Sequence, residues 1–271
     1  MIATESPRRF LDSVQLLLSV LVIPPILAAF DIALRLALVT GDESRLRSFI
    51  QWCTRRMQSL IRVLWRLRFK VEIHPDLISK GSGGTIVVAN HQSPLDILVL
   101  TCAFSSSPPH FVCRSGLEKG YPFISRYIRH RCVVMGSDAK ANKAALEKLG
   151  RHIAATGGVA IIFPEGPKNE RSYPEFRRFQ RSGLEAIARN APSAQVLSVA
   201  IQGTNAAWAS RNRLPKTGST VQVALADRIR TCDVEPSRLA AHCETRIRHS
   251  LGCAAQPRTT PEKKWISAPT H

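Results

Sequence analysis

The spacing of apolar residues changes twice along this chain, and each pattern predicts a different kind of element. Residues 14–39 are almost wholly apolar, as in a membrane-associated segment. In residues 42–68 the apolar positions recur three and four apart, which predicts an amphipathic helix. From residue 69 onward, short apolar or alternating runs of strand type alternate with helical stretches. We therefore expect a membrane-associated helical region at 1–68, a folded domain at 69–253 and a disordered tail at 254–271.

The folded domain carries the pattern of an α/β protein. Alternating strand and helix signals predict a mixed, partly parallel sheet flanked by helices. The predicted strands are residues 69–74, 85–89, 110–114, 132–135, 159–163, 196–201 and 220–226. The predicted helices are residues 94–104, 138–155 and 236–251.

The apolar N-terminal segment predicts a membrane anchor. Arg8 and Arg9 precede it, as in a signal peptide, but no Ala-x-Ala cleavage pattern follows and apolar residues continue to Val39. Pro24 and Pro25 stand in its middle, where proline removes backbone donors and kinks or breaks a helix. Each half would then be about 16 residues, or about 24 Å long, shorter than a bilayer core of about 30 Å. We therefore expect a bent or re-entrant anchor rather than a straight span.

Positive charge dominates the composition. Lys and Arg number 38 against 20 Asp and Glu, which gives a net charge of +18. Such an excess indicates a polyanionic partner: nucleic acid, an anionic membrane surface or a phosphorylated substrate. The anchor, and the arginines interleaved in helix 42–68, favour anionic lipid at the cytoplasmic face of the inner (cell) membrane. Nucleic acid is not expected, because aromatic residues make up 6% of the chain and no binding motif is present.

The seven cysteines are scattered along the sequence, without a CxxC pair or a histidine at ligand spacing. This pattern argues against a zinc site and against a disulfide scaffold. An odd cysteine count also fits a reducing compartment better than a secreted protein. We expect the thiols to be mostly structural, and we expect no bound metal.

The first candidate for chemistry follows the predicted strand 85–89. A polar Asn90-His91 pair comes directly after the strand, and a helix-start signal follows at once. The step of five residues from His91 to Asp96 turns about 140° round a helix, at about 100° per residue. If the two side chains meet, His91 must therefore lie in the turn before the helix and Asp96 in its first turn. A histidine oriented by a carboxylate can act as the general base for a substrate hydroxyl.

The same stretch also has a purely structural interpretation. Ser93 can cap the helix, Pro94 can be its first residue and Asp96 its third, which makes a capping box without any chemistry. Taken alone, the stretch favours neither interpretation. The two can also hold together, because a cap that fixes the helix start would aim Asp96 at His91.

The second candidate is the turn Phe163-Pro164-Glu165-Gly166 at the end of the predicted strand 159–163. Ligands of open α/β sheets bind at the carboxyl ends of strands, and strand 85–89 brings His91 to the same kind of edge. Glu165 can accept a hydrogen bond from a substrate hydroxyl, and Lys168 with exposed backbone amides can hold a phosphate. The alternative is an ordinary Pro/Gly turn with two solvated charges.

These two stretches, in this order and about seventy residues apart, resemble the motifs of the glycerolipid acyltransferase family. The resemblance covers about residues 71–226. It implies that His91 is the base, that Asp96 orients it and that Glu165 and Gly166 belong to the acceptor-binding motif. Further candidates for substrate binding are Asn90, Lys168 and Arg114.

The resemblance implies transfer of a fatty acyl chain from acyl-CoA or acyl-carrier protein to a lysophospholipid hydroxyl. The favoured acceptor is 1-acylglycerol 3-phosphate, which gives phosphatidic acid, and no cofactor beyond the acyl donor is implied. Backbone amides near the start of helix 94–104 are candidates for stabilising the oxyanion.

Two departures from the family pattern leave the acceptor open. Gly136-Ser137-Asp138 stands where the second block usually ends in arginine, and Pro167-Lys168-Asn169 replaces the usual Thr-Arg-Ser. Another lysolipid acceptor is therefore an alternative. A non-catalytic lipid- or nucleic-acid-binding protein is a further one.

Overall fold

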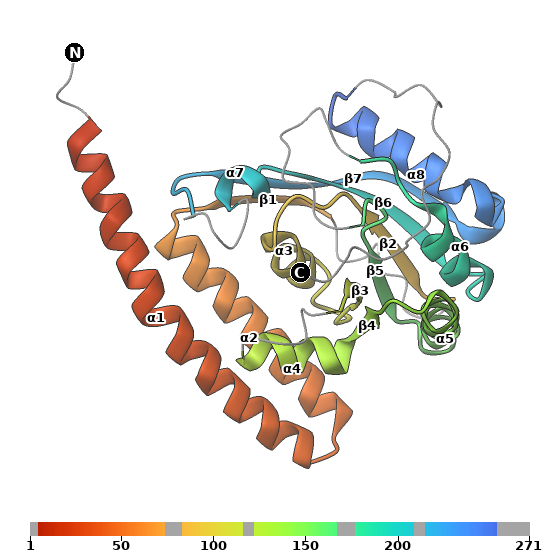
Figure 1. Cartoon of the computed structure of the whole chain (residues 1–271), viewed down its shortest axis with the longest axis horizontal. Helices are drawn as coiled ribbons and strands as arrows, with labels where there is room; N and C mark the ends of the chain where they lie inside the picture. The colour runs from red at the N-terminus through yellow and green to blue at the C-terminus, as the bar shows by residue number, and fades with distance from the viewer. Residues whose placement is uncertain (1–4, 74–82, 116–121, 167–176, 209–214, 254–271) are drawn as a thin grey trace.

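A central β-sheet separates two layers of helices in this computed structural model (Figure 1). The structure describes residues 5–73, 83–115, 122–166, 177–208 and 215–253. One layer contains α5, α6 and α8, and the other contains α2, α3 and α4, with α1 outermost beside α2 and α4. The predicted α/β class, with helices flanking a sheet, is confirmed.

Seven strands form the sheet in the described part of the chain, in the order β1-β7-β6-β2-β5-β3-β4. The strands from β6 to β4 in this order are mutually parallel, whereas β7 is antiparallel to β6 and β1 is parallel to β7. The mixed, partly parallel sheet is therefore as predicted. The strands are β1 (Arg68–Glu72), β2 (Thr85–Ala89), β3 (His110–Arg114), β4 (Cys132–Met135), β5 (Val159–Ile162), β6 (Gln195–Gln202) and β7 (Thr220–Arg230).

The helices include three that the apolar pattern did not predict, namely α4, α6 and α7. Each of the three has ten residues or fewer, too short for a helical period to stand out. The α-helices are α1 (Glu5–Val39), α2 (Glu43–Leu64), α3 (Leu95–Ala103), α4 (Pro122–Arg131), α5 (Ala139–Thr156), α6 (Arg181–Arg189), α7 (Thr204–Ala207) and α8 (Pro236–Ser250), and Thr231–Asp233 form a 3₁₀ turn.

Strand β2 is the centre of the fold because apolar side chains cover both of its faces. All five of its residues are buried, as expected for an inner strand of a parallel region. Val87 packs in the core shared with α2 and α3, and Ile86 and Val88 pack in the core shared with α5, α6 and α8. The end of β2, where the candidate histidine follows, is therefore held by two hydrophobic cores.

Helix α1 is continuous, and the predicted break at Pro24 and Pro25 is wrong. Pro24 and Pro25 have no N–H group, so the carbonyls four residues earlier, those of Val20 and Leu21, lose their usual hydrogen-bond donors. All four residues lie on the exposed side of α1. The lost hydrogen bonds therefore fall on the outer side, where a helix can open slightly without disturbing its packed face. The break that would make the anchor re-entrant is thus absent from the described α1, and a bend at the two prolines stays a prediction.

One face of α1 packs on the rest of the protein. Phe30 makes edge-to-face contacts with Trp52 of α2 and Phe123 of α4, at ring-centroid distances of 5.6 and 5.7 Å. The buried Asp31 carboxylate accepts a hydrogen bond from Arg126 Nε of α4 at 2.8 Å. These contacts hold α1 against α2 and α4.

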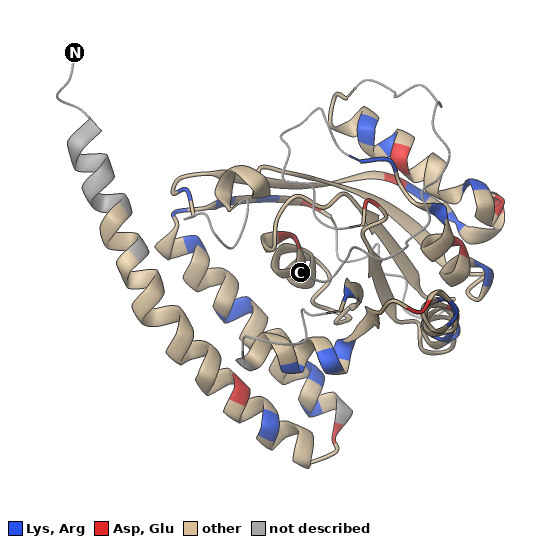
Figure 2. Cartoon of the chain, viewed as in Figure 1, with Lys and Arg blue, Asp and Glu red and all other residues tan. Residues whose placement is uncertain are grey.

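The opposite face of α1 is exposed and apolar, and includes Leu17, Leu21 and Leu36. Within α1, Ser13–Val39 is long and apolar enough to cross a membrane, and no other helix in the described residues is. Figure 2 shows little charge along residues 17–39 of α1 and frequent Lys and Arg along α2. The apolar N-terminal helix is therefore a membrane-anchor candidate.

Helix α2 is the predicted amphipathic helix, capped by Asp42, whose carboxylate accepts from the amides of Ser44 and Arg45. Its apolar stripe, including Leu46, Ile50 and Ile61, belongs to the same core as β2 and α3. The boundary between regions 1–68 and 69–253 stays a prediction, and the predicted tail at 254–271 lies outside the described residues.

Candidate active site

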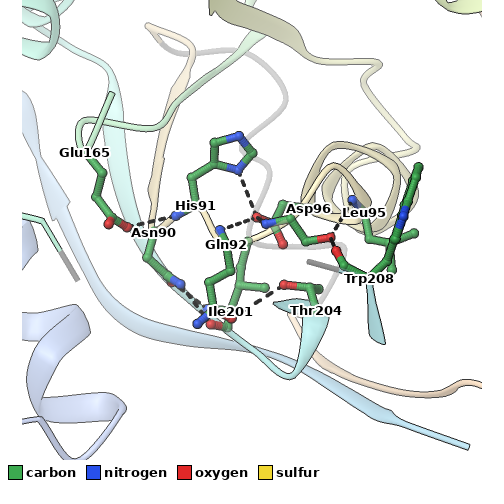
Figure 3. A network of polar contacts seen from close by, with 10 residues as sticks. Asn90, His91, Gln92, Leu95, Asp96, Glu165, Ile201, Thr204 and Trp208 are labelled. Atoms are coloured by element: carbon green, nitrogen blue, oxygen red, sulfur yellow. Dashed lines mark hydrogen bonds and ion pairs between the residues drawn. The ribbon is translucent and has the colours of Figure 1, made fainter. Parts of the chain in front are cut away.

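His91 and Asp96 meet in the short turn that connects β2 to α3 (Figure 3). His91 Nδ1 lies 2.8 Å from Asp96 Oδ2, with His91 in the turn and Asp96 in the first turn of α3. This is the arrangement that the five-residue spacing predicted. The Asp96 side chain is fully buried, whereas 15% of the His91 side chain is exposed.

The hydrogen bonds of Asp96 determine which nitrogen of His91 carries the proton. Asp96 Oδ2 also accepts from the backbone amides of Gln92 and Ser93, at 2.7 and 2.8 Å. An oxygen with two N–H donors acts as an acceptor toward the imidazole as well, so Nδ1 is the protonated nitrogen. In the neutral ring Nε2 is then unprotonated and can take a proton from a substrate.

The capping interpretation is correct only in part, because Pro94 and not Ser93 stands at the cap position of α3 and no side chain caps it. Ser93 Oγ accepts from the Leu95 amide at 3.2 Å, and the Asp96 carboxylate accepts from the Ser93 amide. The helix itself begins at Leu95, one residue later than predicted. A single carboxylate oxygen thus binds the turn before α3 and orients His91, which is one of the two bonds of the predicted capping box.

The amides near the start of α3 are already engaged within the protein. The Gln92 and Ser93 amides donate to Asp96, the Leu95 amide donates to Ser93 Oγ and the Asp96 amide donates to the Ser93 carbonyl. The His91 amide donates to Glu165. The expectation that these amides stabilise an oxyanion is therefore wrong, because each one has an internal acceptor.

Glu165 comes to the same site from the neighbouring strand β5. Its side chain is buried between two backbone segments, which excludes the alternative of a solvated charge at this residue. Oε1 accepts from the His91 amide at 2.9 Å, and Oε2 accepts from the Arg177 amide at 3.0 Å. Burial raises the pKa of Glu165 to about 7, against the opposing effect of the two amides. Glu165 therefore holds the backbone of the site in place.

Asn90 is another predicted substrate-binding residue that has a structural position. Its side chain is fully buried, with Nδ2 donating to the Ile201 carbonyl at 2.8 Å and Oδ1 accepting from the Ile201 amide at 2.7 Å. These two bonds continue the ladder between β2 and β6 beyond the last residue of β2. The prediction of substrate contact is wrong for this amide, because both ends are used on the backbone of β6.

The remaining predicted residues differ in position. Gly166 closes the turn after β5 through its amide, which donates to the Phe163 carbonyl at 3.1 Å, and its φ of 83° favours glycine. Arg114 is exposed at the carboxyl end of β3, the strand next to β5. Lys168 lies outside the described residues.

Phe163 is a site residue that the sequence analysis did not single out. Its ring stacks on the His91 imidazole, with centroids 4.2 Å apart and an interplanar angle of 21°. The contact limits rotation of the imidazole and excludes water from one face of it. The only indication of this role in the sequence is that Phe163 is the first residue of the turn Phe163-Pro164-Glu165-Gly166.

Neither metal nor thiol chemistry is supported by the described residues. No group of three His, Cys, Asp or Glu side chains among them could hold a metal ion. Burial raises the pKa of the Cys102 thiol to about 12, which disfavours the thiolate that a cysteine nucleophile needs.

Comparisons with known proteins agree with this geometry. Residues 68–202 match the sequence model of the acyltransferase family. The chain is similar in structure to the 1-acyl-sn-glycerophosphate (LPA) acyltransferase PlsC from Thermotoga maritima, with a TM-score of 0.71 and 21% sequence identity over 91% of this chain and 96% of that chain. No curated protein matches the sequence. At this identity the structural likeness shows a shared fold, whereas the family match includes His91, Asp96 and Glu165.

Proposed function

Residues 68–202 belong to the acyltransferase family, and we propose that this O-acyltransferase moves a fatty acyl chain from acyl-CoA or acyl-carrier protein to the hydroxyl of a lysophospholipid. The observation that carries the proposal is the 2.8 Å contact between His91 Nδ1 and a fully buried Asp96 at the carboxyl end of β2. This contact leaves Nε2 as the base.

The reaction requires no covalent intermediate on the protein. His91 Nε2 takes the proton of the acceptor hydroxyl as the hydroxyl oxygen attacks the thioester carbonyl. The buried Asp96 carboxylate stabilises the imidazolium that forms, and it keeps the ring in the productive tautomer. When the carbon–sulfur bond breaks, the imidazolium returns the proton to the leaving thiolate, so that an ester and a free thiol are released.

The first acceptor we propose is 1-acylglycerol 3-phosphate, with phosphatidic acid as the product. A net charge of +18 suits a phosphorylated, membrane-borne substrate. The similar fold of the Thermotoga LPA acyltransferase is compatible with the same acceptor.

A lysolipid with another headgroup is the second candidate, and the turn after β4 favours it. Where the family usually has an arginine, Gly136 is closed onto Asn142, whose side chain accepts from the Gly136 amide at 2.8 Å and donates to its carbonyl at 2.9 Å. This turn therefore has an amide side chain that is already bonded to the Gly136 backbone. It has no guanidinium at the place where the family binds a phosphate.

A panel of lysolipids tests both candidates. The full-length protein is offered each lysolipid with acyl-CoA or acyl-carrier protein, and the products are identified by mass spectrometry. We expect phosphatidic acid from 1-acylglycerol 3-phosphate, and His91→Ala should lower turnover at least about 100-fold while the circular dichroism spectrum is retained. Near-normal turnover of folded His91→Ala would refute the assignment of His91, and a different preferred acceptor would support the second candidate.

We further propose that α1 attaches the protein to the cytoplasmic face of the cell membrane, with its exposed apolar face in anionic lipid. Deleting α1 would uncover the packed sides of α2 and α4, so surface substitutions give the sharper test. Replacing Leu17, Leu21 and Leu36 together by Gln leaves the buried face intact and should weaken vesicle binding at least about 100-fold. Full-length wild-type protein that does not sediment with anionic vesicles would contradict the proposal.

A further inference from the structure

A chain of contacts connects the apolar helix α1 to the turn that carries the dyad. It runs from Ser19 of α1 through Trp65 and Trp208 to Ser93, which lies between His91 and Asp96. Ser19 and Trp65 belong to the N-terminal helical region. Trp208 and Ser93 belong to the α/β domain.

The first contact is a buried hydrogen bond between α1 and the residue that ends α2. Trp65 Nε1 donates to Ser19 Oγ at 2.9 Å, and Ser19 Oγ donates to the Gln15 carbonyl at 2.7 Å. Both Trp65 and Ser19 are only 5% exposed. An indole N–H buried without an acceptor is costly, so this bond ties the position of Trp65 to the position of α1.

The second contact joins Trp65 to Trp208, which packs against the same hydrophobic core. The indoles of Trp65 and Trp208 meet edge to face, with centroids 5.6 Å apart and an interplanar angle of 69°. Trp208 follows α7, and its amide donates to the Thr204 carbonyl at 2.8 Å. The Trp65 carbonyl also accepts from the Gly218 amide at 2.9 Å, just before β7. Trp65 is therefore packed between α1 and the segments that follow β6.

The last contacts reach the dyad. The Trp208 carbonyl accepts from the Ser93 hydroxyl, while the Ser93 amide donates to Asp96 Oδ2 at 2.8 Å (Figure 3). That oxygen is the one that lies 2.8 Å from His91 Nδ1. A displacement of Trp208 would therefore move the residue whose amide holds the Asp96 carboxylate.

We propose that Trp65 and Trp208 are positioning residues, which make the geometry of the His91–Asp96 pair depend on the seating of α1 against α2. The inference rests on the proposed acyl transfer and deepens it, because α1 is also the helix proposed to enter the membrane. Loss of the Ser19–Trp65 bond frees Trp208 to shift, and the turn at Gln92 and Ser93 loosens with it. A small misplacement of the base slows catalysis without removing any group that contacts the substrate.

Hydrogen exchange of the full-length protein on vesicles of phosphatidylglycerol and phosphatidylethanolamine tests the connection directly. Trp65→Phe keeps an aromatic ring but removes the N–H donor, and Ser19→Ala removes its acceptor. In either variant we expect the amides of Gln92 and Ser93 to exchange about 10-fold faster than in the wild type. The double variant should match the single ones, because all three lack the same bond.

Kinetics on the same vesicles, with 1-oleoylglycerol 3-phosphate and oleoyl-CoA as substrates, give the second measurement. Trp65→Phe should lower kcat about 5-fold and leave the KM for the acceptor within about 2-fold, because the acceptor's own contacts are retained. Trp52→Phe is the control on the same helix pair: Trp52 lies on α2 and contacts Phe30 of α1, but it is 49% exposed and no ring contact among the described residues joins it to Trp208. Trp52→Phe should leave both kcat and the hydrogen exchange of the Gln92 and Ser93 amides unchanged.

Each result supports or overturns the proposal. Unchanged exchange at Gln92 and Ser93 in Trp65→Phe would overturn it, and so would an equal acceleration in Trp52→Phe or throughout α5, because either would indicate general loosening. If the wild type transfers no acyl group to the lysolipid while the exchange responds as expected, the proposed function fails and the connection to the turn stands.

Discussion

The described part of the chain contains two His–Asp pairs, and their surroundings give them different properties. At the end of β2, His91 uses Nδ1 to bind Asp96, at 2.8 Å. On the face of the sheet covered by α8, His242 uses Nε2 to bind Asp227 of β7, at 2.6 Å. The two contacts have nearly the same length, so distance alone does not distinguish a base from a structural pair.

The partners of the two carboxylates make the difference. Asp96 is fully buried and is held by the backbone amides of Gln92 and Ser93, and no Lys or Arg among the described residues forms an ion pair with it. Asp227 also pairs with Arg246, at 3.3 Å, and the side chains of His242 and Asp227 are 32% and 12% exposed. Partial burial works to raise the pKa of Asp227, but hydrogen bonds from His242 and Arg246 outweigh it and hold the pKa below its ordinary value.

Position in the sheet also separates the two pairs. His91 and Asp96 follow the carboxyl end of a central parallel strand, and ligands of open α/β sheets bind at that end of the strands. Asp227 lies within β7, in register with Ser198 of β6, and α8 packs over it. The place of the first pair at the carboxyl ends of the parallel strands, and the nitrogen that it leaves unprotonated, are the reasons why we propose a chemical role for it and not for the second pair.

The largest expected effect comes from changing each aspartate to asparagine. Asp96→Asn keeps an oxygen for the Gln92 and Ser93 amides but loses the charge that orients and stabilises the imidazolium, so acyl transfer should fall at least about 100-fold. Asp227→Asn should leave turnover within about 2-fold. Rates are measured with saturating lysolipid and acyl-CoA, and comparable losses in the two variants would remove the distinction between the pairs.

A smaller effect concerns Glu165, the buried carboxylate that accepts a hydrogen bond from the His91 amide. The raised pKa means that, between about pH 4.5 and pH 7, the folded protein holds a proton that the unfolded chain releases. The free energy of unfolding of the wild type should therefore fall as pH rises through this window, by on the order of 3 kcal/mol relative to Glu165→Gln. Chemical denaturation at pH 4.5 and pH 7.5 measures the difference. Parallel pH dependence in the two proteins would contradict the assignment.

The smallest effect is expected from the second pair itself. His242→Ala removes one partly exposed hydrogen bond to a carboxylate that keeps Arg246, so the free energy of unfolding should fall by only about 1 kcal/mol at pH 7. Because the pKa of Asp227 is lowered, the stability that its carboxylate contributes is present above the ordinary value of 3.8 and is lost as pH falls below it. The free energies of unfolding of Asp227→Asn and the wild type should therefore converge at low pH, as measured by denaturation. A loss of acyl transfer in folded His242→Ala would contradict the distinction between the two pairs.

The sequence alone was sufficient for the architecture and for the position of the dyad. Apolar runs such as residues 85–89 and 159–163 predict buried strands because a strand covered on both faces needs apolar residues at every position. The five-residue step from His91 to Asp96 requires a turn before the helix, since the two residues cannot share one helical face. The buried strands and the turn before the helix both depend on residues that are close in the sequence, so the local backbone geometry determines them.

Only the tertiary structure decided the roles of the side chains that reach across elements. Asn90 and Glu165 look like substrate ligands in the sequence, yet their partners are backbone groups of Ile201, His91 and Arg177 on other segments. The continuity of α1 through two prolines likewise depends on which face of the helix is packed. A buried polar group is satisfied by whatever the fold brings within about 3 Å of it, and sequence spacing does not report that distance.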